Sequence, residues 1–114
     1  MLKTITSKQL KKLMDSITDV TVVNVLGRAA FEQGHIHGSI NIPVDEIETE
    51  ALKLLDRDET IVVHCTNDAC SASETAGEKL QKMGFKDVRR FKGGIEEWKQ
   101  SGFSLEGQAY RKAA

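Results

Sequence analysis

The chain has 114 residues and a net charge of −1, with 16 basic and 17 acidic side chains spread along its length. This length is typical of one domain with a single core, so we expect residues 1–114 to form one domain. The absence of a basic run argues against nucleic acid or an anionic membrane as a partner. No stretch approaches the roughly 20 apolar residues of a membrane span, and the first residues lack a signal core, which predicts a cytoplasmic protein.

The pattern of apolar residues predicts strands that alternate with helices. Short runs typical of strands occur at residues 2–5, 19–25, 39–42, 60–64 and 88–91. The second run is the clearest, because valines occupy four of its seven positions, as in a sheet that is covered on both faces. Pro43, the only proline, ends the third run because it cannot donate to a central ladder.

Segments with helical spacing of apolar residues lie between these runs. They are residues 7–17, 28–34, 44–55, 71–83 and 95–100, followed by a mixed tail over 101–114. Thr6 or Ser7 caps the first helix. Its apolar face consists of Leu10, Leu13, Met14 and Ile17. The alternation predicts an α/β fold with a mainly parallel central sheet flanked by helices on both faces.

Cys65 stands where the buried run 60–64 ends, on the loop that leads to the next helix. Ligand sites in parallel sheets lie at the carboxyl ends of the strands. A strand-to-helix loop can turn its N–H groups toward its first side chain, and the helix directs the positive end of its dipole there, which stabilises a thiolate or a bound anion. Cys70 follows five positions later, and in a cytosolic protein two such thiols are more often catalytic or redox-active than a structural disulfide.

Four blocks of sequence cover nearly the whole chain: FEQGHIHGSINIP at 31–43, IVVHC at 61–65, GF at 84–85 and FKGGIEEW at 91–98. In content and order they resemble the single-domain rhodanese (sulfurtransferase) family. The resemblance implies a single rhodanese-like domain that needs no cofactor. In that family the cysteine at the position of Cys65 accepts a sulfane sulfur as a persulfide and passes it to a nucleophilic acceptor.

The resemblance also implies a role for each residue of the loop. Cys65 is the expected catalytic nucleophile, which must react as a thiolate. The substrate-binding loop consists of Thr66, Asn67, Asp68, Ala69, Cys70 and Ser71. The expected partners are a small sulfur donor (persulfide, polysulfide or thiosulfate) and a thiol or cyanide acceptor. Asn24, where the family often has an aspartate, is expected to support the loop by hydrogen bonding.

The loop departs from the family pattern C-x-x-G-x-R-S at two positions. Cys70 stands where many members that use thiosulfate place an arginine, and the absence of this arginine weakens the case for thiosulfate as the donor. Asp68 replaces a common glycine; it raises the thiol pKa and repels an anionic donor if it points toward Cys65, and costs little if it points outward. Before the loop, Leu26 replaces an arginine that often pairs with the acid at Glu32, and Arg28 could substitute for it.

Cys70 has two interpretations that the sequence leaves open. It is either a resolving or relay thiol, which attacks the persulfide or sulfenate on Cys65 to form a disulfide, or a loop-edge residue without a role. The alternative to a sulfurtransferase is therefore a redox-sensing or protein-binding module that uses the Cys65/Cys70 pair and has little thiosulfate activity. A phosphatase is excluded, because Ser71 stands where the phosphate-binding arginine is required.

The histidines do not predict a metal site, because they lack the paired ligand spacing of structural zinc sites. His35 is expected to be structural, and His37 to lie in solvent or at a pocket edge. His64 is expected to face the side of the sheet opposite Cys65 and not to act as its base. The aromatic side chains of Phe91 and Trp98 are expected to belong to the core.

Overall fold

The computed structural model describes residues 2–16 and 19–110 of the chain. Its centre is a sheet whose strands are β1 (Lys3–Ile5), β2 (Val20–Asn24), β3 (Ile40–Asn41), β4 (Thr60–His64) and β5 (Asp87–Phe91). They lie in the order β1-β5-β4-β2-β3, and every pairing between them is parallel. The predicted α/β fold with a mainly parallel sheet is therefore confirmed, and β4, which precedes Cys65, occupies the middle of the sheet.

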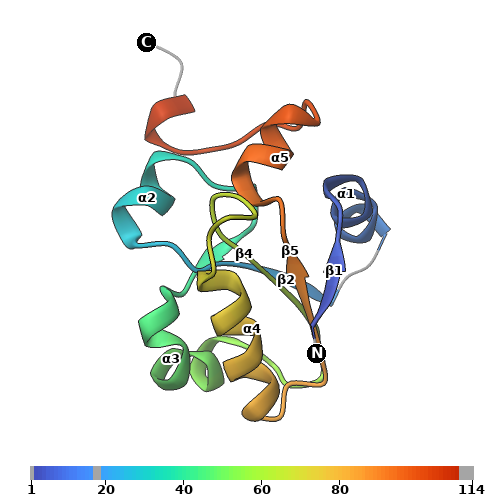
Figure 1. Ribbon diagram of the computed structural model, residues 1–114, viewed down its shortest axis with the longest axis vertical. Helices are drawn as coiled ribbons and strands as arrows, with labels where there is room; N and C mark the ends of the chain where they lie inside the picture. The colour runs from blue at the N-terminus through green and yellow to red at the C-terminus, as the bar shows by residue number, and fades with distance from the viewer. Residues whose placement is uncertain (1, 17–18, 111–114) are drawn as a thin grey trace.

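Helices cover both faces of this sheet, as predicted (Figure 1). They are α1 (Ser7–Ser16), α2 (Arg28–Gln33), α3 (Ile47–Leu54), α4 (Ala72–Lys82) and α5 (Gly94–Gln100), with 3-10 turns η1 (Val44–Glu46) and η2 (Gln108–Tyr110). Ile61 and Val63 of β4 pack in one apolar cluster with residues of α3 and α4. Val62 enters a second cluster with Leu10 of α1 and Trp98 of α5. Successive strand residues thus serve opposite faces of the sheet.

The segment 44–55 differs from the single helix expected for it. It begins as η1, in which the Glu46 N–H donates to the Pro43 carbonyl at 2.8 Å, and only then continues as α3. Such a 3-10 turn at the start of an α-helix is common. The third strand is also shorter than expected, with two residues instead of four, because β3 is an edge strand that pairs with β2.

Thr6, one of the two candidate caps, caps the N-terminus of α1. Its Oγ1 accepts a hydrogen bond from the Gln9 N–H at 3.2 Å, and Gln9 Oε1 accepts one from the Thr6 N–H at 2.9 Å. This reciprocal pair is a capping box. The expected apolar face is confirmed for Leu10, Leu13 and Met14. Ile17, which was expected on the same face, lies outside the described residues.

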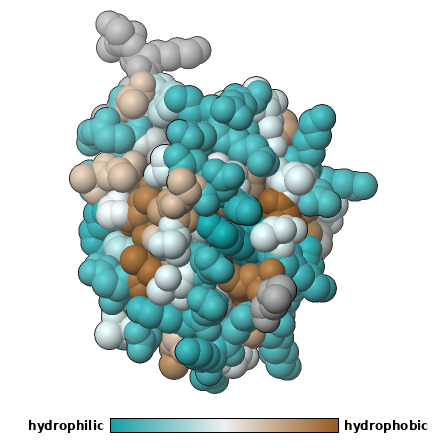
Figure 2. Space-filling model, in the orientation of Figure 1, coloured by the Kyte–Doolittle hydropathy of each residue, from teal (hydrophilic) through white to brown (hydrophobic). Residues whose placement is uncertain are grey.

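The face shown in Figure 2 is mainly hydrophilic, with apolar residues in small patches. The large apolar side chains that stay exposed among the described residues are Leu52, Leu54 and Tyr110. Isolated exposed apolar residues of this kind are normal. Within residues 2–16 and 19–110, the helices are too short or too polar to cross a membrane.

Candidate active site

Cys65 follows directly after β4, at the carboxyl end of the central strand, and its loop runs to the start of α4 (Figure 1). This is the predicted position. The strand ends here because the backbone of α5 replaces the sheet as hydrogen-bond partner. The Ile95 N–H donates to the Cys65 carbonyl at 3.1 Å, and the Glu96 N–H donates to the Thr66 carbonyl at 3.0 Å. The first turn of α5 thus holds the base of the loop.

Gly94 makes this close approach between α5 and the loop possible. Its φ is +61°, a backbone conformation that residues with a Cβ rarely adopt. A Cβ at this position would lie 2.3 Å from the carbonyl oxygen of Cys65. Gly94 of the FKGGIEEW block is therefore required by the backbone of the loop.

The two thiols of the chain lie against each other inside the loop. Cys65 is 1% exposed, whereas Cys70 is half-buried, and both are free. Each thiol shifts the pKa of the other. Cys65 Sγ also lies 3.4 Å from the Cys70 carbonyl oxygen and 3.5 Å from Ser73 Oγ.

The surroundings of the two thiols shift their pKa values in opposite directions. Burial raises the pKa of Cys65, the contact with Cys70 raises it further, and the hydroxyl and amide of Ser73 oppose these effects. Burial also acts to raise the pKa of Cys70. It is outweighed by hydrogen bonds from the Cys65 thiol and from the amides of Ala72 and Thr66, so the pKa of Cys70 is lowered. These surroundings favour the charged form of Cys70 and disfavour that of Cys65.

Two residues of the site, Ser73 and Arg90, were missed from the sequence. Arg90 of β5 is 8% exposed. Its Nε donates to Ser73 Oγ at 2.8 Å, and its Nη2 donates to the Cys70 carbonyl at 2.9 Å. Its charge contributes to the lowered pKa of Cys70. The register of β5 could have indicated Arg90. It lies opposite Val63, so it shares with Cys65 the face of the sheet that α4 covers.

The other loop residues form the outer rim of the site. Thr66, Asp68, Ala69 and Ser71 are exposed. Asn67 braces the rim, because its Oδ1 accepts from the Ala69 N–H and its Nδ2 donates to Glu96 Oε2, both at 3.1 Å. Asp68 shares a hollow of about 200 Å³ with Glu96 and Glu97 on the side of α5. Of the two orientations considered for Asp68, the structure shows the outward one.

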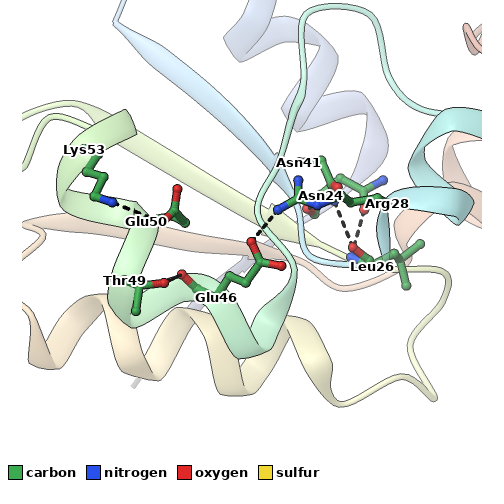
Figure 3. A network of polar contacts seen from close by, with 8 residues as sticks. All are labelled: Asn24, Leu26, Arg28, Asn41, Glu46, Thr49, Glu50 and Lys53. Carbon is green, nitrogen blue, oxygen red and sulfur yellow. Dashed lines mark hydrogen bonds and ion pairs between the residues drawn. The ribbon is translucent and has the colours of Figure 1, made fainter.

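Asn24 supports the backbone next to the site and not the loop itself. It is fully buried, and its Oδ1 accepts from the Leu26 N–H at 2.9 Å. Asn41 Nδ2 donates to the carbonyls of Asn24 and Leu26, at 3.0 and 2.8 Å (Figure 3). These bonds fix the turn after β2, and Asn24 reaches the site only as the register partner of His64.

Arg28 also has a partner other than the one considered from the sequence. It forms an ion pair with Glu46 of η1 and not with Glu32 (Figure 3). Both side chains are at least one-third exposed, at 62% and 36%, so the pair contributes little to stability.

The three histidines take the positions expected for them. His64 is fully buried beside Phe91 on the face opposite Cys65, and burial lowers its pKa to about 4. His35 stacks on Phe31, and its Nδ1 lies 2.8 Å from the Phe31 carbonyl. His37 is exposed and contacts Glu106. In the described part of the chain, no group of three or more His, Cys, Asp or Glu residues is placed to hold a metal ion.

Phe91 and Trp98 are core aromatics, as expected. Their ring centroids lie 6.2 Å apart in an edge-to-face arrangement. Trp98 is 3% exposed, and its Nε1 donates to the Ser104 carbonyl at 3.0 Å. Both rings lie beneath the α5 side of the site and do not form a substrate platform.

Comparison with known proteins agrees with this geometry. Rv0324, an HTH-type transcriptional regulator of Mycobacterium tuberculosis, is 32% identical over 88 residues, which are 77% of this chain and 38% of that protein. The putative sulfur carrier protein YrkF of Bacillus subtilis is 31% identical over 88 residues, 77% of this chain and 46% of that protein. The chain thus spans less than half the length of either of these relatives.

A solved structure and a family model extend the match to most of the chain. The solution structure of the rhodanese-like domain of the Anabaena protein Alr3790 matches with a TM-score of 0.87 and 27% identity, covering 100% of this chain and 86% of that one. A model of the rhodanese-like domain matches residues 6–101. The chain therefore belongs to the rhodanese-like domain family.

Proposed function

We propose that this domain is a sulfurtransferase that carries a sulfane sulfur as a persulfide on Cys65. The observation that carries the proposal is the buried Cys65 at the end of the central strand, whose Sγ lies 3.4 Å from the Cys70 carbonyl and 3.5 Å from Ser73 Oγ at the start of α4. Preorganised hydrogen-bond donors such as the Ser73 hydroxyl stabilise a thiolate or persulfide anion in a site shielded from water. The name of the relative YrkF, a putative sulfur carrier protein, supports the same chemistry.

The reaction begins with a proton transfer inside the pair. Cys70, whose pKa is lowered, takes the proton of the neighbouring Cys65 thiol as the donor binds. The Cys65 thiolate attacks the terminal sulfur of a persulfide R–S–SH. The S–S bond of the donor breaks, R–S⁻ leaves, and Cys65–S–SH is formed. An acceptor thiolate or cyanide then attacks the terminal sulfur and returns Cys65 as a thiolate.

The charge around the loop favours persulfide or polysulfide over thiosulfate as the donor. Cys70 occupies the loop position from which an arginine would bind thiosulfate in two places. On the outer side of the loop, Asp68, Glu96 and Glu97 present carboxylates to an approaching dianion. We propose that the protein acts in the cytoplasm on a small donor and a thiol acceptor, which a partner protein can supply.

The contact between the thiols also favours a second candidate function, in which the pair works as a dithiol device. In that reaction the Cys70 thiolate attacks the inner sulfur of the Cys65 persulfide, a Cys65–Cys70 disulfide forms, and HS⁻ leaves. With a peroxide as oxidant, the attacked thiol becomes a sulfenic acid and then condenses with the other thiol, releasing water. An external thiol restores either product.

A transfer assay with matched cysteine variants tests the proposal. Reduced protein is supplied with a small-molecule persulfide, and thiocyanate formation from cyanide is followed for the wild type, Cys65→Ser and Cys70→Ser. We expect Cys65→Ser to fall to the uncatalysed rate, because the nucleophile is gone. Cys70→Ser should retain transfer but reach its full rate only at higher pH, because the internal base is lost. Equal transfer by wild type and Cys65→Ser would exclude the proposed function.

A further inference from the structure

Arg90 is a buried cation whose hydrogen bonds do not neutralise its charge. Its guanidinium donates to the Ser73 hydroxyl and to the Cys70 carbonyl, both neutral acceptors. Among the ion pairs of residues 2–16 and 19–110, none involves Arg90. A buried charge is costly without a compensating charge nearby. A nearby group is therefore expected to supply the negative charge that compensates Arg90.

The residues that surround Arg90 show which groups can compensate its charge. Thr4 and Val63, its register partners on β1 and β4, are uncharged. From α4, Glu74 and Glu78 line a pocket of about 100 Å³ together with Arg90. Arg90 donates to neither of these carboxylates; it donates to Ser73 at the start of α4 and to Cys70 in the loop.

Both acceptors of Arg90 lie next to Cys65 Sγ. Ser73 Oγ lies 3.5 Å from Cys65 Sγ, so the hydroxyl stands between guanidinium and thiol. The Cys70 carbonyl binds Arg90 directly and also lies 3.4 Å from Cys65 Sγ. Asp68, the remaining acid of the loop, faces outward beside α5. The groups inside the loop that can carry a negative charge opposite Arg90 are therefore the two sulfurs.

We propose that Arg90 is a positioning residue of the site: it supplies from β5 the positive charge that the loop itself lacks, it orients the Ser73 hydroxyl so that this can donate to Cys65 Sγ, and it offsets the dipole of the Cys70 carbonyl beside the same sulfur. Its side chain does not project from the loop toward a donor, so it stabilises the anion on the enzyme without binding thiosulfate. The part of this inference that concerns a persulfide anion rests on the proposed function.

The pH profile of thiol alkylation tests this role without any sulfur transfer. The reaction of reduced protein with iodoacetamide is followed across pH for the wild type, Arg90→Gln, Arg90→Lys and Ser73→Ala. Arg89→Gln serves as the matched control, because Arg89 is the preceding residue of β5 and its partner is Asp87. Circular dichroism establishes that each variant is folded.

We expect Arg90→Gln to react about tenfold more slowly at neutral pH and to recover at higher pH, which corresponds to a shift of about one pKa unit. Arg90→Lys should stay near the wild-type profile because it keeps the charge, and Ser73→Ala should shift in the same direction as Arg90→Gln but less. Arg89→Gln should match the wild type.

A wild-type profile in folded Arg90→Gln would overturn the inference. If Arg90→Gln does not fold, the decision passes to Ser73→Ala and Arg90→Lys, and an unshifted Ser73→Ala profile would overturn it. The assay also separates the two proposals. Unshifted profiles together with normal sulfur transfer contradict only the role of Arg90, whereas shifted profiles in a protein that transfers no sulfur contradict only the proposed function.

Discussion

Cys65 and Cys70 show how a single contact divides the work between two chemically identical side chains. Cys65 is enclosed and loses solvation of its charged form, whereas Cys70 is half-buried and receives hydrogen bonds from two amides. In the proposed function the buried thiol is the protected carrier, and the pKa of the more exposed thiol is the lowered one.

The burial of His64, which precedes Cys65, predicts how the free energy of unfolding depends on pH. Burial lowers its pKa from 6.5 to about 4, so between these values the unfolded chain binds more protons than the folded one. The free energy of unfolding should be highest above pH 6.5 and fall by roughly 3 kcal/mol as the pH is lowered to about 4. Urea unfolding at several pH values measures this loss.

Two histidine variants isolate the contribution of His64 from that of the carboxylates. His64→Gln should show a smaller loss of stability between pH 6.5 and 4 than the wild type. The exposed His37 provides the control, and His37→Gln should lose as much as the wild type. A His64→Gln protein with the wild-type pH dependence would show that this buried ring does not govern it.

The residues of the site were predicted where a local pattern marks them. Cys65 ends a β-branched run, and family resemblance added the loop. Arg90 and Ser73 were missed because their contact joins β5 to α4, and no spacing within one segment reports it. The orientation of Asp68 was likewise open, because it depends on how the loop packs against α5.

At the scale of elements, the contact between α5 and the loop is the feature that positions Cys65. Gly94→Ala should destabilise the fold by at least about 2 kcal/mol, because it combines a positive φ with a Cβ placed 2.3 Å from the Cys65 carbonyl. Gly27→Ala is the matched control, since a Cβ there meets no atom within 4 Å. Its stability should change by less than about 0.5 kcal/mol. Equal urea midpoints for the two variants would show that the fold does not require a glycine at position 94.

The order and type of the strands and helices followed from periodicity and the positions of glycine and proline. Helix boundaries were harder, as η1 shows: apolar spacing over residues 44–55 does not distinguish a 3-10 turn from the first turn of α3. The length of β3 depended on its place at the sheet edge, which is a property of the assembled sheet.

For the molecule as a whole, we propose that residues 1–114 unfold as one domain. Trp98, the only tryptophan, is buried in the cluster between the sheet and α1, whereas α3 and α4 cover the other face. Tryptophan fluorescence therefore reports one face, and far-ultraviolet circular dichroism reports all helices. The two unfolding transitions in urea should coincide. Separate midpoints would show that the faces unfold independently.

The central claim is that Cys65 carries the transferred sulfur, and locating that sulfur in the loaded protein tests it most directly. After reaction with a persulfide donor and blocking of free thiols, trypsin releases residues 58–79 as a peptide that contains both cysteines. Fragmentation by mass spectrometry should place one additional sulfur atom on Cys65 in the wild type and in Cys70→Ser, and none in Cys65→Ser. An additional sulfur found only on Cys70, or on neither cysteine, would contradict the account.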